Sequence, residues 1–184
     1  MSDEEAIDHY LKTQNTNYFN LLYDRYTNKV YAKSISMLND HGTAEDATQE
    51  IFVKILLSLS DFSGKSKFST WLYSITYNYC IDQIRREKKD ITTPMYGKQH
   101  YDQIDDEMYD SEIKETNVYR LKETLTMLNA EDKSILMMKY QDELSINEIC
   151  QVLNKTESAV KMKIMRAKAK FLRVYNQQYG DITS

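Results

Sequence analysis

Residues that interrupt helices are rare in this chain. Its 184 residues include one proline and four glycines, and apolar residues recur at steps of three and four along most of its length. That spacing places apolar side chains on one face of a helix, and few helix breakers stand in the way. The sequence therefore predicts an all-α protein. A hydrophobic fraction of 41% is compatible with packed cores, and the length suits one domain or two small ones.

Acidic residues are concentrated in the middle of the chain. Residues 90–117 contain eight Asp or Glu against two Lys or Arg, and they include the only proline, Pro94. This composition is typical of a linker. We expect two small helical domains, residues 1–89 and 118–184, joined by an acidic flexible linker over residues 90–117.

The stretch from Ser145 to Phe171 predicts a helix-turn-helix. Ser145 and Glu148 have the spacing of a capping box at the start of a short helix. Asn154 tolerates the left-handed backbone at a helix end, and Thr156 is a suitable cap for the next helix. The first helix has an apolar stripe of Ile146, Ile149, Cys150 and Leu153. The second has a stripe of Val160, Ile164, Ala167 and Phe171 that we expect to face the core.

The second helix of this motif is strongly basic. Between Lys155 and Arg173 there are seven Lys or Arg and one acidic residue, Glu157. The face opposite the core stripe holds Ser158, Lys161, Met162, Met165 and Arg166. Basic groups can recognise guanine edges in the major groove, and apolar groups can contact thymine methyls. Flanking residues that could neutralise phosphates are Lys155, Lys163, Lys168 and Lys170. The pattern favours DNA binding; the alternative is a solvated basic face on an ordinary helical hairpin.

Residues 43–60 predict an amphipathic helix with a second, unusual face. We expect this helix to be capped by Thr43. Its core stripe is formed by Ala44, Ala47, Ile51 and Ile55. The second face holds Asp46, Gln49, Glu50, Val53 and Leu57. Acidic groups mixed with apolar ones favour a protein-binding surface. The alternative is burial of both faces inside a helical bundle.

Residues 67–89 predict a helix that is apolar on two sides. A narrow polar strip of Ser74, Asn78, Asp82 and Arg85 lies between those sides. The loop before the helix contains Phe62, Lys65 and Lys67. Aromatic and amide groups among positive charges are typical of single-stranded DNA binding. The aromatic pattern alone is more typical of a core, and we expect Trp71 to be part of one.

The sequence gives little support for a metal-binding protein, an enzyme, or a secreted or membrane protein. Cys80 and Cys150 lie in different segments without metal-ligand partners, and the three histidines are scattered. There is no Gly-rich phosphate loop and no nucleophile with a paired base. We therefore expect a non-enzyme without metal or cofactor. The acidic N-terminus is unlike a signal peptide, and no apolar run approaches the roughly 18 residues of a membrane span, so we expect a cytoplasmic protein.

The motifs "AEDATQEIF", "FSTWLY", and "LSINEIC" with "AVKMKIMRAK" together resemble a bacterial sigma factor of the extracytoplasmic-function (ECF) branch of the sigma-70 family. The resemblance covers residues 17–89 and 118–173 and implies an alternative sigma factor. The first domain, like sigma region 2, would bind RNA polymerase core and the minus-10 element. The second, like sigma region 4, would bind the minus-35 element. The alternative is a one-component helix-turn-helix regulator.

The resemblance also implies roles for particular residues. Those that match the surface for the clamp of the largest polymerase subunit are Asp46, Gln49 and Glu50, with Val53 beside them. Phe62 and Asn78 match a pocket for a flipped non-template base, and Lys65, Lys67 and Arg85 complete the expected minus-10 set. Lys161, Met162, Met165 and Arg166, with Ser158, match the residues that recognise the minus-35 element. The implied partners are RNA polymerase core, promoter DNA in duplex and single-stranded form, and an anti-sigma factor. Asn154 replaces the family's turn glycine, and "ITYN" replaces its common "IARN".

Overall fold

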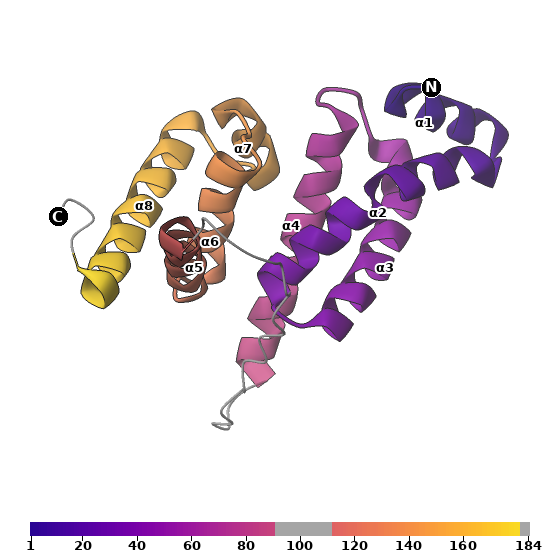
Figure 1. The fold of residues 1–184 in the computed structure, drawn as a ribbon. Helices are drawn as coiled ribbons and strands as arrows, with labels where there is room; N and C mark the ends of the chain where they lie inside the picture. Colours follow the sequence, from indigo (N-terminus) through magenta and orange to yellow (C-terminus); the bar gives the residue numbers. More distant parts are fainter. Residues whose placement is uncertain (91–111, 181–184) are drawn as a thin grey trace.

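The computed structural model describes residues 1–90 and 112–180, with side chains for 1–87 and 118–180, and every element there is helical. The first domain comprises α1 (Asp3–Thr13), α2 (Thr16–Leu38), α3 (His41–Ser58), a short 3-10 turn η1 (Leu59–Asp61) and α4 (Phe68–Asp90). The second comprises α5 (Glu112–Thr126), α6 (Ala130–Leu136), a π-helical turn η2 (Met137–Gln141), α7 (Ile146–Leu153) and α8 (Glu157–Tyr179). The prediction of two helical domains is confirmed (Figure 1).

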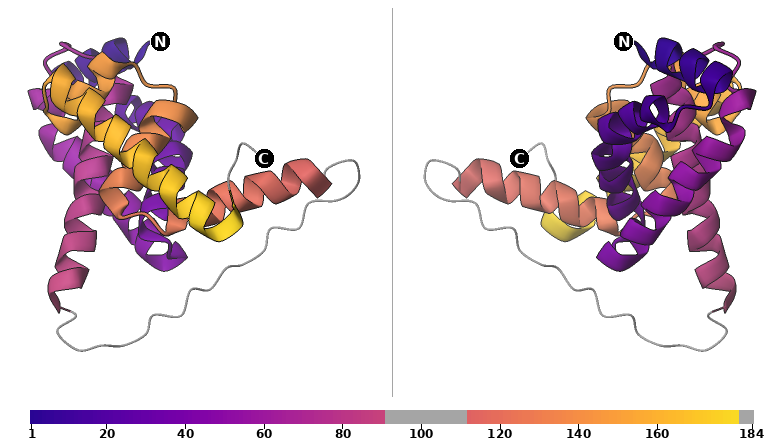
Figure 2. Two further views of the ribbon diagram at one scale, coloured as in Figure 1. Left: turned by 90° about the vertical axis from the view of Figure 1, so that its left-hand side faces the viewer. Right: turned by 90° about the vertical axis from the view of Figure 1, so that its right-hand side faces the viewer.

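Most of the predicted acidic linker lies outside the described residues. Within the range 90–117, the structure describes residue 90 and residues 112–117, and α5 begins at Glu112, earlier than the predicted start of the second domain. The last turns of α4 and the first turns of α5 extend beyond the packed helices (Figure 2).

The first domain is built around helices α2, α3 and α4. Leu22, Ile51, Ile55, Leu59 and Phe68 are almost fully buried in its core. The stripe predicted for α3 is confirmed, with Ala44, Ala47, Ile51 and Ile55 all buried. One stripe of α3 faces this core. The opposite side of the helix is therefore available to contact another molecule.

The predicted N-cap of α3 was wrong by three residues. The helix begins at His41, and its N-cap is Asp40, whose carboxylate accepts the backbone N–H of Thr43 at 2.8 Å. The Thr43 hydroxyl also donates to that carboxylate, at 2.7 Å. Asp is as good a cap as Thr, and an ionised carboxylate suits the positive end of the helix dipole. These hydrogen bonds lower the pKa of Asp40.

Helix α1 had not been predicted. Ser2 and Glu5 form a capping box at its start, and Asp3 binds Arg25 and Tyr26 of α2. Ala6 and Ile7 are buried against the first core. The spacing of Ser2 and Glu5 was a signal in the sequence that could have identified this helix.

The second domain contains the predicted helix-turn-helix. The capping box of Ser145 and Glu148 opens α7, and Asn154 ends it in the left-handed region with a φ of 49°. Thr156 caps α8 by accepting the backbone N–H of Ala159. Val152, which was not in the predicted stripe, is buried beside Ile149.

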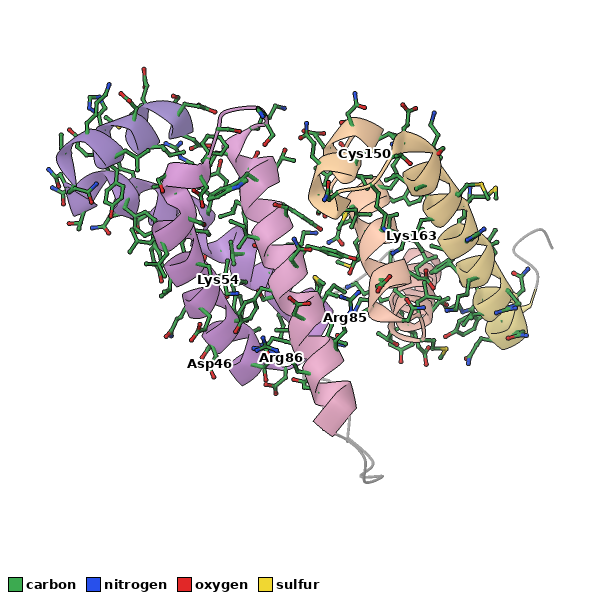
Figure 3. The ribbon with its side chains drawn as sticks, turned by 180° about the vertical axis from the view of Figure 1, so that it is seen from behind. Asp46, Lys54, Arg85, Arg86, Cys150 and Lys163 are labelled. Carbon is green, nitrogen blue, oxygen red and sulfur yellow. The ribbon has the colours of Figure 1, made fainter. Side chains whose placement is uncertain are left out.

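Helix α4 belongs to both hydrophobic cores. Its Phe68 and Leu72 pack in the first domain, whereas Tyr77, Cys80 and Ile81 join a cluster with residues of α6, α7 and α8. The prediction that α4 is apolar on two sides is thereby confirmed. Figure 3 shows α4 between α3 and the second domain. The two domains therefore pack directly against each other, which the sequence did not predict.

Candidate nucleic-acid and polymerase interfaces

The face predicted to bind duplex DNA lies on the exposed side of α8. Its members, Ser158, Lys161, Met162, Met165 and Arg166, are all exposed, and Met162 and Met165 expose 44% and 56% of their surface. Val160, Ile164 and Ala167 on the other side are buried. Methionines are normally buried, so two exposed ones among cations indicate a contact surface. Lys161 forms an ion pair with Glu157 one turn earlier, which orients its ammonium group along the helix.

The lysines beside this face fall into two groups. Lys155 and Lys168 are exposed. Lys163 instead binds Glu131 at 2.7 Å, and Lys170 binds Asp132 at 3.0 Å. Both of these pairs join α8 to the first turn of α6. They stabilise the domain and leave the exposed face, with Lys155 and Lys168, available for DNA.

The aromatic residue predicted to receive an unpaired base lies at the edge of the first core. The Phe62 ring packs edge-on against Phe68, with centroids 5.7 Å apart, and at 5.4 Å from Trp71. Phe62 and Trp71 are both half-buried, so Trp71 borders the core and is not enclosed by it. Asn78 is exposed on α4. It lies seven residues, or about 10 Å, beyond Trp71 on the same helix face.

Two of the three cations predicted for the minus-10 element contact the second domain. Lys65 is exposed. Lys67 lies 3.8 Å from Glu148 of α7, and Arg85 binds Glu131 of α6 at 3.0 Å. In Figure 3, Arg85 lies on the side of α4 that faces the second domain.

The carboxylates in these contacts are stabilised in their charged form. Hydrogen bonds from Lys163 and then Arg85 lower the pKa of Glu131. The pKa of Glu148 is lowered chiefly by the Ser145 backbone N–H and hydroxyl, and less by Lys67. Both groups are therefore negative at neutral pH and attract the cations of the first domain.

A partly buried polar network between the domains was missed by the sequence analysis. Asp142, which directly follows η2, binds Lys33 of α2, and its other oxygen accepts the Tyr73 hydroxyl at 3.0 Å. The Lys33 ammonium also lies 5.6 Å from the centre of the Tyr73 ring. Burial and then the charge of Asp142 raise the pKa of Tyr73, so its hydroxyl remains a donor. These residues are far apart in sequence, and no local pattern connects them.

The predicted polymerase-binding face is exposed on α3. Asp46, Gln49 and Glu50 are exposed, and Val53 and Leu57 expose 53% and 78% of their surface. The alternative, burial of both faces of α3, is therefore wrong. Asp46 lies at the outer side of the first domain, away from the second (Figure 3). The combination of carboxylates and bare apolar side chains fits a protein partner.

Comparisons with known proteins agree with this arrangement. The model of sigma-70 region 2 matches residues 22–90, and the model of sigma-70 region 4 matches residues 119–171. The ECF RNA polymerase sigma factor SigW of Bacillus subtilis is 33% identical over 153 residues, which cover 79% of this chain and 82% of the relative. The sigma factor SigM of the same organism is 28% identical over 87% of this chain and 96% of its own length.

Solved structures show the same fold. CnrH, in complex with the cytosolic domain of CnrY, has a TM-score of 0.66 at 20% identity and covers 95% of this chain and 97% of its own. RpoE of Bartonella quintana, in complex with the anti-sigma factor NepR, has a TM-score of 0.66 at 19% identity, covering 85% of this chain and 95% of its own.

The class defined by these two domains is that of the transcription initiation factors with sigma regions 2 and 4. Within it, the chain belongs to the ECF sigma factors of the sigma-70 family, as its matches to both regions and to SigW show. Its function is that of an alternative sigma factor. No helix among residues 1–90 and 112–180 has the length and apolar character needed to cross a membrane.

Proposed function

We propose that this sigma factor divides promoter recognition between its two domains. The domain of residues 1–89 binds RNA polymerase core and the minus-10 element, and the domain of residues 118–184 binds the minus-35 element. The observation that supports this division best is the presence, in one chain, of an exposed basic helix-turn-helix face on α8 and an exposed acidic and apolar face on α3. A DNA-binding protein that acted alone would have no use for the second face.

The exposed face of α8 would enter the major groove of the minus-35 element. Lys161 and Arg166 are the groups that can donate to guanine, and Met162 and Met165 can contact thymine methyls. Ser158, near the N-terminus of α8, can donate to a base edge or a phosphate. Lys155 and Lys168 would neutralise phosphates beside this face.

The strip along α4 and its preceding loop would hold the opened minus-10 element. Phe62 offers a ring for stacking, and the exposed amide of Asn78 can both donate to and accept from a base edge. Lys65, Lys67 and Arg85 would attract the phosphates of the single strand. A base that leaves the duplex loses a few kcal/mol of stacking and pairing, and contacts with Phe62 and Asn78 would compensate for that loss.

The second face of α3 would bind the clamp of the largest polymerase subunit. Asp46 and Glu50 would contact basic groups there, and Gln49 would add hydrogen bonds. Val53 would lose its exposed surface in the complex. Complementary charge increases the rate of association, and buried apolar surface slows dissociation.

An anti-sigma factor is the expected regulatory partner. The matched structures of CnrH and of RpoE are complexes, the first with the cytosolic domain of CnrY and the second with the anti-sigma factor NepR. We extend this kind of regulation to the present chain, and we place the protein in the cytoplasm with the polymerase.

Transcription with purified core polymerase tests the proposal. Core polymerase alone and core with this protein would be given a library of genomic promoter fragments, and run-off transcripts would be compared. We expect a set of transcripts that requires the protein and shares two upstream sequence elements. A protein that binds promoter fragments but neither binds core nor directs transcription would instead be a one-component helix-turn-helix regulator.

A further inference from the structure

The second domain contains a large apolar groove between α5, α6, η2 and α8. Its volume is about 750 Å³, within the roughly 300–1,000 Å³ that is typical of small-molecule sites. Most of its walls are aliphatic side chains and aromatic rings, among them Leu121, Leu125, Leu136, Tyr140 and Phe171. The five residues of α8 that we assign to the minus-35 element do not line it. The groove is therefore a surface to which the proposed function gives no role.

The local structure around the groove is typical of a binding site. Met137, Tyr140 and Gln141 of its lining belong to η2, which is a π-helical turn. Such turns are rare and occur frequently at functional sites. Leu121 and Tyr140 expose 42% and 59% of their surface, so large apolar side chains remain in contact with water beside the hollow. Exposed apolar surface gathered around a concavity favours a ligand that covers it.

The charge of the groove has one sign. Among the described residues that line it, none is Asp or Glu, and three are lysines: Lys122, Lys133 and Lys168. None of these three forms an ion pair with a carboxylate of the described side chains. Glu131 and Asp132, which directly precede Lys133 on α6, bind other lysines of α8. The groove is thus left with positive charge that an anion could compensate.

Lys133 is the most enclosed of the three lysines. It is half-buried, whereas Lys122 and Lys168 are exposed. Its ammonium donates to the Oδ1 atom of Asn39 at 3.4 Å, a long hydrogen bond for a group that has three donors. Burial lowers the pKa of Lys133, because its charged form has lost water and has no carboxylate beside it. An anion bound at this ammonium would restore what burial removes.

We propose that the groove binds a fatty acid, with the carboxylate on Lys133 and the apolar chain along Leu121, Leu125 and Phe171. A fatty acid has one anionic group at the end of an otherwise apolar molecule, which matches one half-buried ammonium among apolar walls. Lys122 and Lys168 add attraction for the anion from their exposed positions. The inference goes beyond the proposed function and does not rest on it, since the exposed faces of α8 and α3 do not line the groove.

The test uses the full-length protein and two probes of equal chain length, decanoate and its neutral analogue decanol. Both are kept below the concentration at which they aggregate, and their affinities are measured by titration calorimetry. Lys133→Met removes the ammonium and keeps a long, apolar side chain. Its matched control is Lys139→Met, which changes another half-buried lysine of the same domain that does not line the groove.

We expect the wild type and Lys139→Met to bind decanoate about tenfold more tightly than decanol, because a hydrogen bond to a charged group strengthens the binding of decanoate alone. Lys133→Met should lose this preference and still bind decanol, since the apolar walls are intact. Leu172→Glu places a carboxylate at an exposed position of the lining and should weaken decanoate binding more than decanol binding. Thermal unfolding of each variant shows whether it is folded.

Three results would contradict the proposal. Equal affinities of the wild type for decanoate and decanol would mean apolar adsorption without recognition of the carboxylate, and would overturn it. An undiminished preference for decanoate in folded Lys133→Met would overturn the assignment of Lys133. If neither probe binds the wild type, the groove is not a fatty-acid site and would instead suit a segment of a protein partner.

Discussion

The two surfaces that we propose bind DNA differ in whether their cations are already paired with the other domain. On α8, Lys161 and Arg166 lie on an exposed face, and Lys161 forms an ion pair with Glu157 of its own helix. On α4, Arg85 binds a carboxylate of the other domain, and so does Lys67 just before the helix. On the proposed assignments, recognition of duplex DNA by α8 would need no change in these ion pairs, whereas contact of Lys67 and Arg85 with the opened strand would require them to leave their carboxylate partners.

The largest effect on transcription is expected from substitutions at the proposed site for the opened strand. Phe62→Ala with Asn78→Ala should reduce transcription from a fully paired promoter by about a hundredfold, because an extruded base would lose a few kcal/mol of compensation. Promoter binding before opening should be nearly unchanged, as neither residue contacts paired DNA. Gel-shift and run-off assays measure the two steps. Phe62 also packs on Phe68 and Trp71, so the thermal unfolding of the variant must be checked against that of Asn78→Ala alone.

The second effect concerns recognition of the duplex. Arg166→Ala removes a possible bidentate contact to guanine and should weaken promoter binding by about 1 to 3 kcal/mol while relaxing the base preference at one upstream position. Arg173→Ala, an exposed change farther along α8, is the matched control and should leave that preference intact. Unaltered preference in the Arg166 variant would exclude Arg166 as a base contact.

The third effect concerns the polymerase and should leave both DNA surfaces unchanged. Asp46→Lys with Glu50→Lys should weaken binding to core polymerase about tenfold or more, since both groups are exposed on the proposed interface. Thermal unfolding should hardly change, because surface substitutions are usually small in effect. The control, Glu4→Lys with Asp24→Lys, makes the same charge change at exposed positions of the same domain. If the variant and the control bind core equally well, the α3 face is not the interface.

The smallest effect is a pH dependence of stability, which Glu131 contributes through Lys163 of its own domain and then Arg85 of the first. The pKa of Glu131 is lowered in the folded protein from 4.5, so its contribution to stability is fully present above that pH and is lost as the pH falls through the lower folded value. The melting temperature of Glu131→Gln should lie slightly below that of the wild type at neutral pH. The difference should shrink below pH 4.5. A difference that stays constant in acid would mean that the Glu131 charge adds nothing to stability.

Local sequence patterns predicted α3, α4, α7 and α8, together with the exposed faces of α3 and α8. The capping box at Ser145, the left-handed Asn154 and the Thr156 cap are each determined by neighbours within three or four residues. The buried stripes of α3 and α8 follow from helical periodicity in the same way. Such features are encoded locally, so they can be found without a structure. The start of α3 was wrong because Asp40 and Thr43 are both competent caps, and nothing local decides between them.

The contact between the domains could not be predicted in this way. Lys33 and Asp142 are separated by 109 positions, and neither lies in a motif. The helix of residues 67–89 was predicted to be apolar on two sides, but periodicity does not say which domain covers each side. Only the folded chain shows that one side of α4 belongs to a second core. It also shows that Lys67 and Arg85 have ion-pair partners in the second domain.

Transcription from two templates tests the central claim most directly, namely that the two domains act at different steps. One template is fully paired, and the other has a pre-opened bubble across the minus-10 element. The account predicts that the bubble partly restores transcription by the Phe62 and Asn78 double variant, because the template no longer has to be opened, and that it does not restore transcription by Arg166→Ala. Rescue of both variants, or of neither, would contradict the division of recognition and opening between the two domains.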